Sequence, residues 1–370
     1  MRLLHFVRND SPFNVHLFLP FNIDTRSKEI ETIRGAKMKK LIGVLAIGAL
    51  VLGWSSMAPA ADKVTLNLNW FYVGDHSPYF VATEKGWYKE EDLDVNIIPG
   101  KGSGDVVKKI DVGSAEFGIV DTGVLIVARA QGAKVKVVSM LFDKSPYCMW
   151  MWKESGINSI KDLAGKKIGA PPGDAQRTIF PALAAANGLD PDKVTFVNIG
   201  AEAKISALAA KQVDVIFDFY SGAPFYYKAI GQDKVNHLMF ADWGVDVYSN
   251  AIVVTDKYAQ EKGNIIKRFV KASLRGWEFT LKNPEEAINI MAKYRTEIDK
   301  PVMLANLKLI IDLFRTNRYK QNGIGWVEEK KMADSITIIS KYRDLKVNMK
   351  TSDLYTNEYL TKIALPIEVK

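Results

Sequence analysis

The sequence predicts an α/β protein of two lobes with a ligand cleft between them. Strand-like and helix-like segments alternate from residue 63, and the same alternation begins again near residue 159. This alternation is typical of mainly parallel sheets that helices cover on both faces. No low-complexity linker separates the two runs, so we expect crossing strands rather than independent domains. With 370 residues, 48% of them hydrophobic, the chain is long enough for about two domains.

The segment before the first strand has the three parts of a secretory signal peptide. Two lysines follow Met38, an apolar run covers residues 41–54, and small residues close the segment before residue 62. A membrane anchor is the alternative, but an apolar run of about 14 residues is shorter than the roughly 20 that span a bilayer. Residues 1–37 show no sustained period, and we interpret them as a gene-start artefact upstream of a signal peptide at residues 38–61.

The first run of elements begins with residues 64–70 (VTLNLNW), which alternate apolar and polar side chains and therefore predict a half-buried strand. Ser77 and Pro78 provide the cap and first-turn proline of a helix, and Gly86 fits its C-terminus. The segments that follow are typical of strand, helix, strand, helix and strand: 93–98, 99–113, 115–120, 121–132 and 135–142.

The second run repeats this order and is followed by a helical C-terminal part. Its expected helices cover residues 159–165, 177–188 and 203–212, and its expected strands cover 166–170, 193–199 and 213–218. Residues 248–254 look like a returning strand, and the segments 264–282 and 284–295 have a helical period of 3.6. We expect crossings at 147–152 and 248–254. The predicted first lobe is therefore 62–147 plus 253–370, and the second is 148–252.

Loops that leave the C-terminal ends of parallel strands line the crevice where such sheets bind ligands. Two lobes of this kind that face each other would form a cleft. The loops expected to line it are 70–77, 101–105, 121–123, 171–177 and 218–221.

Two long segments carry a family resemblance. Residues 69–138, which begin NWFYVGDHSPYFVATEKGW, and residues 155–199, which include SIKDLAGKKIGAPPGD, resemble the periplasmic substrate-binding proteins of ABC importers. The closer resemblance is to the branch that contains thiamine-pyrimidine-precursor, nitrate, sulfonate and taurine binders. It implies a two-lobed periplasmic binding protein fold of type II that closes around one small molecule. It also implies a periplasmic location, an ABC permease with its ATPase as partners, and a monomer.

The first lobe offers five candidate ligand residues. Trp70 could stack on a flat ring, although its period also fits the strand core. Asp75 and His76 follow in the loop, where Asp75 could instead cap a helix. Asp121 and Thr122 stand at a later strand-to-helix corner.

The second lobe and the crossings complete the candidate set. The GDAQRT segment opens a helix whose N-terminus could bind an anion, with a guanidinium nearby for a bidentate grip, while its aspartate could simply cap the helix. Further aromatic and acidic side chains follow a strand or lie at the crossings. These candidates are Gly173, Asp174, Gln176, Arg177, Asp218, Tyr220, Tyr147 and Tyr248.

Trp, Tyr and Asp suit a flat ring with N–H donors better than a small oxyanion. We therefore expect a pyrimidine-like heterocycle, with an alkyl sulfonate, taurine, nitrate or an aromatic carboxylate as alternatives. Related pyrimidine synthases are marked by a cysteine-rich segment, whereas this chain has the single Cys148, so we expect no enzyme, cofactor or disulfide. Only two histidines follow the signal segment, which does not support a histidine metal site, and the 42 Lys/Arg against 38 Asp/Glu left after residue 61 do not indicate nucleic-acid binding. A ligand-sensing partner of a receptor is a further alternative.

Overall fold

The computed structural model describes residues 60–142, 144–343, 345 and 349–360. Residues from Ala61 onward form one compact unit. The upstream stretch 1–37 and all but the last two residues of the predicted signal peptide lie outside the described residues. No helix among the described residues is both long enough and apolar enough to cross a membrane.

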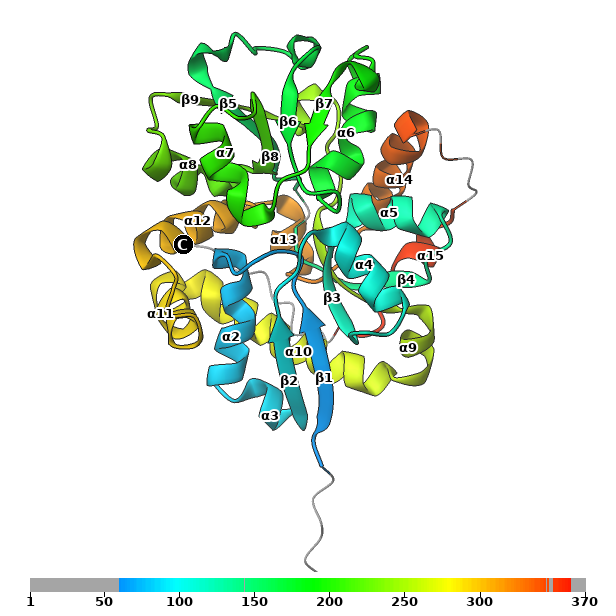
Figure 1. Ribbon diagram of the computed structural model, residues 1–370. Coiled ribbons are helices and arrows are strands. Elements are labelled where there is room, and N and C mark those ends of the chain that lie inside the picture. The colour runs from blue at the N-terminus through cyan, green and yellow to red at the C-terminus, as the bar shows by residue number, and fades with distance from the viewer. Residues whose placement is uncertain (1–59, 143, 344, 346–348, 361–370) are drawn as a thin grey trace, which may run out of the picture. The chain divides into compact units, whose positions relative to one another are not determined.

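The compact unit contains two five-stranded sheets with helices around them, as the sequence predicts (Figure 1). The first sheet has the order β2-β1-β3-β10-β4. Its strands are β1 (Asp62–Asn67), β2 (Leu93–Ile98), β3 (Phe117–Asp121), β4 (Val135–Met140) and β10 (Asn250–Thr255). β1 pairs in parallel with β2 and β3, while β10 runs antiparallel to β3 and β4 because it returns from the other sheet.

The second sheet repeats this arrangement with the order β7-β6-β8-β5-β9. Its strands are β5 (Tyr147–Trp152), β6 (Lys167–Gly169), β7 (Thr195–Val197), β8 (Val215–Phe219) and β9 (Val235–Met239). β6 is parallel to β7 and β8, and β5 is the antiparallel strand, entering directly from the first sheet. Each sheet thus has one antiparallel strand where the chain arrives from its partner.

Helices connect the strands within each sheet. Around the first sheet these are η1 (Gly74–His76), α2 (Ser77–Glu84), α3 (Trp87–Glu90), α4 (Ser103–Asp111) and α5 (Thr122–Ala130). Around the second they are η2 (Lys153–Ser155), η3 (Ile160–Leu163), α6 (Ala175–Ala186), η4 (Pro191–Lys193), η5 (Ala201–Ala203), α7 (Lys204–Ala209), η6 (Tyr220–Gly222), α8 (Ala223–Ala229) and η7 (Ala241–Trp243). After β10 the chain is helical, as expected: α9 (Asp256–Glu261), α10 (Gly263–Lys282), α11 (Pro284–Tyr294), α12 (Lys300–Asp312), α13 (Asn317–Asn322), α14 (Glu329–Arg343) and α15 (Thr351–Leu354).

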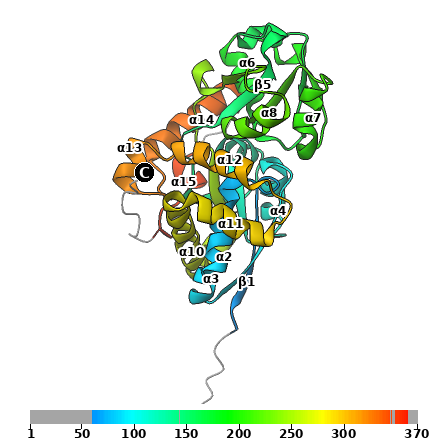
Figure 2. The ribbon, with the colours of Figure 1, turned by 90° about the vertical axis from the view of Figure 1, so that its left-hand side faces the viewer.

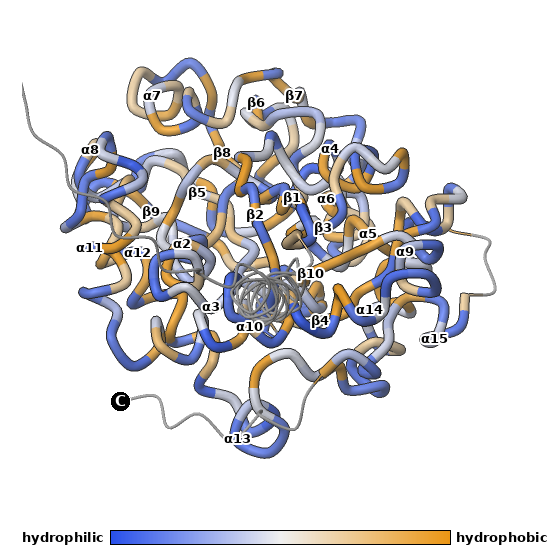
Figure 3. The backbone as a smooth tube through the Cα atoms, turned by 90° about the horizontal axis from the view of Figure 1, so that it is seen from below, coloured by the Kyte–Doolittle hydropathy of each residue, from blue (hydrophilic) through white to orange (hydrophobic). Residues whose placement is uncertain are grey.

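Alternating side chains of the strands enter different hydrophobic cores. In β3, Ile119 packs into the core beneath α2 and α10, whereas Val120 packs into a second core that continues to Phe217 of the other sheet. β10 divides its side chains in the same way, and its hydrophobic colour stands out in Figure 3, where the outlying α13 is mostly hydrophilic. Both faces of these strands are covered, which explains their continuous apolar sequence.

The chain passes between the two sheets just before β5 and just before β10. The sequence predicts these two strands themselves as the crossings. Residues 147–152 are β5, which pairs with β8 and β9, and residues 250–255 are β10, which pairs with β3 and β4. Each of these strands is therefore hydrogen-bonded within one sheet, and the connecting chain is 141–146 and 240–249. The sequence therefore predicts the crossings a few residues too late, because the connecting segments and the strands are both apolar.

Helix α12 belongs to the first core but also faces the second lobe. Its Leu307 is buried in the core of the first sheet, whereas Leu309 packs against the core that holds Trp150 of β5. Lys228 of α8 forms an ion pair with Asp299, the N-cap of α12. Figure 2 shows α12 at the junction between the two sheets.

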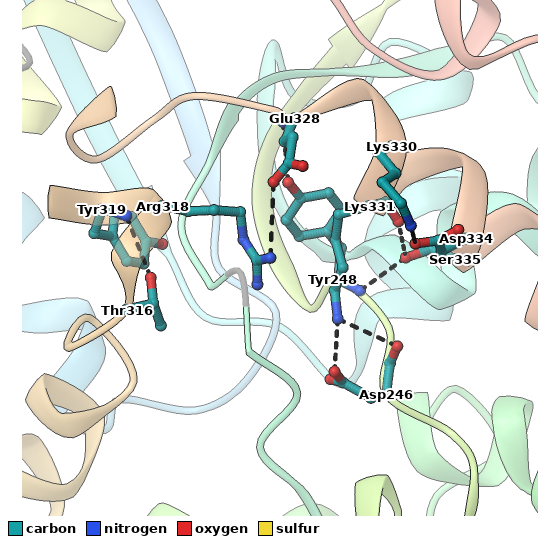
Figure 4. Close-up of polar contacts among 10 residues, drawn as sticks. All are labelled: Asp246, Tyr248, Thr316, Arg318, Tyr319, Glu328, Lys330, Lys331, Asp334 and Ser335. Atoms are coloured by element: carbon teal, nitrogen blue, oxygen red, sulfur yellow. Dashed lines mark hydrogen bonds and ion pairs between the residues drawn. The ribbon is translucent and has the colours of Figure 1, made fainter. Parts of the chain in front are cut away.

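Helix α14 ties the second crossing to both lobes. Lys331 Nζ donates to Asp246 Oδ2 at 2.7 Å, and Tyr248 N donates to Ser335 Oγ at 3.1 Å (Figure 4). The same helix packs against α6 of the second lobe and α5 of the first. The lobes are thus in contact through α14 on one side and α12 on the other.

Candidate ligand site

A pocket lies where the loops of the two sheets meet. It contains about 740 Å³ of atom-free space, part of which is open to solvent. Its lining comes from the segments after β1, β2, β6, β7 and β8 and from α12. The lining residues are Asn69, Trp70, Phe71, Val73, Asp75, Gly102, Ser103, Asp174, Ala175, Gln176, Ala201, Lys204, Ile205, Asp218, Phe219, Ser221, Gly222, Phe225 and Asn306.

The wall from the first lobe is held by a buried chain of side-chain hydrogen bonds. His76 Nδ1 accepts from Val73 N at 3.3 Å, so the ring proton is on Nε2, which donates to Asn69 Oδ1 at 3.0 Å. Asn69 Nδ2 donates in turn to Asn250 Oδ1 at 3.2 Å. Burial lowers the pKa of His76, which keeps the imidazole neutral, and burial raises the pKa of the neighbouring Asp75 carboxyl.

The wall from the second lobe contains a buried ion pair. Lys204 Nζ, at the start of α7, lies 2.6 Å from Asp174 Oδ2 and 2.6 Å from Phe217 O. Both charged side chains are at least 97% buried. The same ammonium lies 4.4 Å from the centre of the Trp70 ring, which reaches across from the first lobe. The indole therefore covers the ion pair where the two lobes meet.

Asp218 adds a second carboxyl group to this wall. Its Oδ1 accepts from Phe219 N at 2.7 Å and its Oδ2 accepts from the Tyr226 hydroxyl at 3.0 Å. Burial raises the pKa of Asp218, and the Lys204 ammonium partly opposes this shift. These two hydrogen bonds fix the orientation of the carboxyl group, and Asp218 lines the pocket.

Asn306 of α12 connects the two lobes at the pocket. Its Oδ1 accepts from Gly74 N at 2.9 Å and its Nδ2 donates to Ser221 O at 2.6 Å. A side chain at Gly74 would lie 2.7 Å from Asn306 Oδ1, so the close approach requires glycine. One amide thereby satisfies backbone groups of both lobes.

The glycine-rich loop 99–104 contacts the second lobe through backbone atoms. Gly104 N donates to Gly173 O at 3.1 Å. A Cβ on Gly102, whose φ is +115°, would lie 2.4 Å from Gly173 O. The glycines here allow the backbones of two lobes to meet, which agrees with a position at the rim of the cleft and excludes bulkier residues.

The pocket brings together five of the residues predicted from sequence: Trp70, Asp75, Asp174, Gln176 and Asp218. Trp70 follows the end of β1 rather than continuing it, so it is not the next core residue of that strand. Asp75 lies in η1 and does not cap α2. Asp174 does cap α6, accepting from Arg177 N at 3.0 Å.

The other eight predicted residues do not line this pocket: His76, Asp121, Thr122, Tyr147, Gly173, Arg177, Tyr220 and Tyr248. The Arg177 guanidinium turns away from it, donating to Ala170 O at 3.0 Å and to Asn198 Oδ1 at 2.6 Å. Tyr147 is buried behind Phe219, with their ring centres 6.1 Å apart. Thr122 is buried and donates to Ser249 O at 2.7 Å.

Asp121 anchors the strand-to-helix corner behind the pocket. It caps α5 by accepting from Gly123 N at 2.9 Å, and it accepts from Ser249 Oγ at 2.8 Å, next to the second crossing. Burial raises its pKa to about 6. Its position supports the loop geometry rather than the pocket surface.

Three polar residues of the pocket lie outside every loop that the sequence predicts to line the cleft. Lys204 stands near the start of a predicted helix, Asn69 precedes the tryptophan, and Asn306 lies more than 230 residues after the loop that it contacts. A lysine in a helix that is otherwise apolar and alanine-rich could have indicated Lys204. The position of Asn306 depends on tertiary packing and has no local signal.

Comparison with known proteins places the chain in a family. Residues 73–287 match the family described as NMT1/THI5 like. The chain belongs to the NMT1/THI5-like family. This member is 26% identical over 311 residues to a 4-amino-5-hydroxymethyl-2-methylpyrimidine phosphate synthase of Legionella pneumophila, covering 82% of this chain and 94% of the relative. It is 24% identical to the formylaminopyrimidine-binding protein of Halalkalibacterium halodurans, covering 71% of this chain and 80% of that protein.

Solved structures show the same fold. The alkanesulfonate-binding protein SsuA of Xanthomonas axonopodis pv. citri, solved with bound MOPS, superposes with a TM-score of 0.63 at 14% sequence identity. The match covers 80% of this NMT1/THI5-like chain and 98% of that protein. The predicted periplasmic binding protein fold and the predicted family are both confirmed.

Proposed function

We propose that this protein is the solute-binding component of an importer and that it captures a flat heterocycle with N–H donors, of the pyrimidine-precursor type. The observation that carries the proposal is Asp75. Asp75 is 5% exposed, lines the pocket and has no Lys or Arg ion-pair partner among the described residues. A buried carboxyl group without such a partner favours a ligand that supplies hydrogen-bond donors.

The charges around the pocket support the same class of ligand. Asp75, Asp174 and Asp218 contribute three carboxyl groups, against the single ammonium of Lys204. A sulfonate or nitrate would have to approach these carboxyl groups, and the guanidinium expected to bind it points elsewhere. Aromatic side chains in the lining, among them Trp70 and Phe219, provide the apolar surface that a planar ring prefers.

Lobe closure is the mechanism we propose for capture. Residues of both lobes line the pocket, so a bound molecule would stabilise the arrangement in which they meet. We propose 62–147 plus 253–370 as the first lobe and 148–252 as the second, limits that lie within a few residues of the connecting segments 141–146 and 240–249. We further propose that residues 38–61 direct export, that the mature protein acts as a periplasmic monomer, and that an ABC permease with its ATPase receives the ligand.

Titration calorimetry with 4-amino-5-hydroxymethyl-2-methylpyrimidine tests this function. We expect binding of one equivalent, with no heat from ethanesulfonate or nitrate. Asp75→Asn should weaken binding of the pyrimidine by about 10- to 100-fold, because a hydrogen bond to a charged group contributes about 1.5–3 kcal/mol. Asp94→Asn, on the exposed face of β2, is the matched control and should bind as the wild type does.

Two outcomes would contradict the proposal. Binding of the sulfonate alone would keep a solute-binding protein but reject the heterocycle. Phosphorylated pyrimidine released from the purified protein would instead favour a synthase, a possibility that the name of the Legionella relative raises. Mass spectrometry of the secreted protein should find an N-terminus near Asp62, and peptides from residues 1–37 would reject the proposed start at Met38.

A further inference from the structure

A second cavity lies behind the pocket, between the second sheet and α12. It contains about 700 Å³ of atom-free space, part of which is open to solvent, and is lined by the first crossing, η6, β9 and α12. We call it the crossing cavity, and its lining residues are Lys144, Ser145, Pro146, Tyr220, Ser221, His237, Met239, Leu309, Asp312 and Leu313. Ser221 is the one residue that lines both this cavity and the ligand pocket.

The aromatic side chains of the second lobe end at the crossing cavity. Trp150 of β5 is nearly parallel to Tyr226, at 4.8 Å and 12°, and to Tyr220, at 6.4 Å and 10°. The His237 ring lies 5.1 Å from both Trp150 and Tyr220. Tyr226 and Trp150 are fully buried, whereas Tyr220 and His237 are only partly buried and line the cavity.

The remaining lining restricts what could occupy this space. Pro146, Met239, Leu309 and Leu313 give an apolar part of the surface, and a methionine sulfur also favours aromatic neighbours. The polar part of the lining consists of Lys144, Ser145, Ser221 and Asp312 beside the two partly buried rings. Burial lowers the pKa of His237, so the imidazole is neutral near pH 7 and offers one N–H donor and one acceptor nitrogen. An occupant that matches both features is planar and apolar on its faces, with a donor and an acceptor at its edge.

The cavity is held in place by backbone contacts. Tyr220 N donates to Pro146 O at 2.9 Å, which fixes η6 against the first crossing. Asn306 of α12 donates to Ser221 O at 2.6 Å on the same side. These two contacts hold η6 between the first crossing and α12, and the cavity beside it is partly open to solvent.

We propose that the crossing cavity is a second binding site, for a planar heteroaromatic molecule of about two fused rings. One face of the molecule packs on Tyr220, and its edge forms hydrogen bonds with His237. This site is separate from the ligand pocket and does not depend on which solute that pocket binds. It also gives a role to Tyr220, which the sequence placed in the cleft and the structure places here.

Neighbouring residues provide a matched test. Phe219 lines only the ligand pocket and Tyr220 lines only the crossing cavity, although they are adjacent in sequence. Benzimidazole is a suitable probe because it is planar, has two fused rings and carries one donor and one acceptor. In calorimetric titration of the mature chain, Tyr220→Ala should weaken benzimidazole binding about tenfold, from lost stacking and buried area. The Phe219→Ala variant should still bind one equivalent of benzimidazole.

A second variant tests the cavity by filling it. Leu309→Trp adds bulk to the lining and should abolish benzimidazole binding, with a thermal transition close to that of the wild type as evidence of folding. Benzimidazole bound unchanged by both Tyr220→Ala and Leu309→Trp would overturn the proposal. So would a loss confined to Phe219→Ala, which would place the probe in the ligand pocket, or no binding by the wild type at millimolar concentration.

Discussion

Replacing Lys204 by methionine should strongly destabilise the protein before any ligand is added. The substitution keeps a long side chain against the Trp70 ring but leaves the Asp174 carboxylate, 1% exposed, without its cation. It also removes the donor to Phe217 O. Loss of one partner from a buried ion pair costs about 3–5 kcal/mol, whereas the cation–π contact contributes about 0.5–2 kcal/mol, so the orphaned carboxylate decides the result.

A double-mutant cycle separates the pair from the lost packing. Asp174→Asn keeps a residue that can cap α6, and the double variant buries no unpaired charge at either position. We expect the double variant to be more stable than Lys204→Met alone and the coupling energy to exceed about 2 kcal/mol. Urea unfolding at pH 7, followed by far-UV circular dichroism, gives the four free energies of unfolding. Additive effects of the two substitutions would refute the reasoning, because they would mean that the charges do not depend on each other.

Three further predictions concern closure and pH. Asn306→Ala removes both hydrogen bonds that connect the lobes and should lower the free energy of unfolding in urea by about 1–3 kcal/mol; a loss below about 0.5 kcal/mol would contradict its bridging role. Asp121 has a folded pKa of about 6, above its unfolded value, so the folded state binds more protons between these values and this residue's contribution to stability increases as the pH falls from about 6 toward 4. The difference in unfolding free energy between wild type and Asp121→Asn should therefore change across that window, and a constant difference would contradict the raised pKa. Gly102→Ala should push the loop away from Gly173 and weaken ligand binding at least about tenfold, whereas Gly113→Ala, also at a positive φ but with no atom within 4 Å of its Cβ, should not; equal effects would assign the loss to backbone strain alone.

Much of the fold is predictable from local sequence, because the elements and their ends depend on residues close together. The alternation of residues 64–70, the cap at Asp121 and the glycine after α2 all act within a few positions. The predicted crossings lie several residues after the observed ones, because buried strands and buried connections have the same apolar composition. Hydrogen bonding between strands, which sequence does not show, separates them.

The candidate site was only partly predictable, for a different physical reason. Residues at or just after strand ends, such as Trp70 and Asp218, are brought to the pocket by the sheet topology. Whether a side chain then faces the pocket depends on its partners: Arg177 follows the same strand edge but binds Ala170 O and Asn198 instead. Asn306 reaches the site only because α12 packs between lobes, an arrangement that requires the complete fold.

The contact between Gly104 and Gly173 uses backbone atoms only. The groups that join the rims of the two lobes at this point are therefore different atoms from the side chains that would recognise a solute. Substitutions in the pocket can change which molecule is preferred without altering this contact, and the contact can be lost without altering the preference. Selectivity and closure are in this respect independently variable properties, and a redesigned pocket could keep the existing rim while accepting a different cargo.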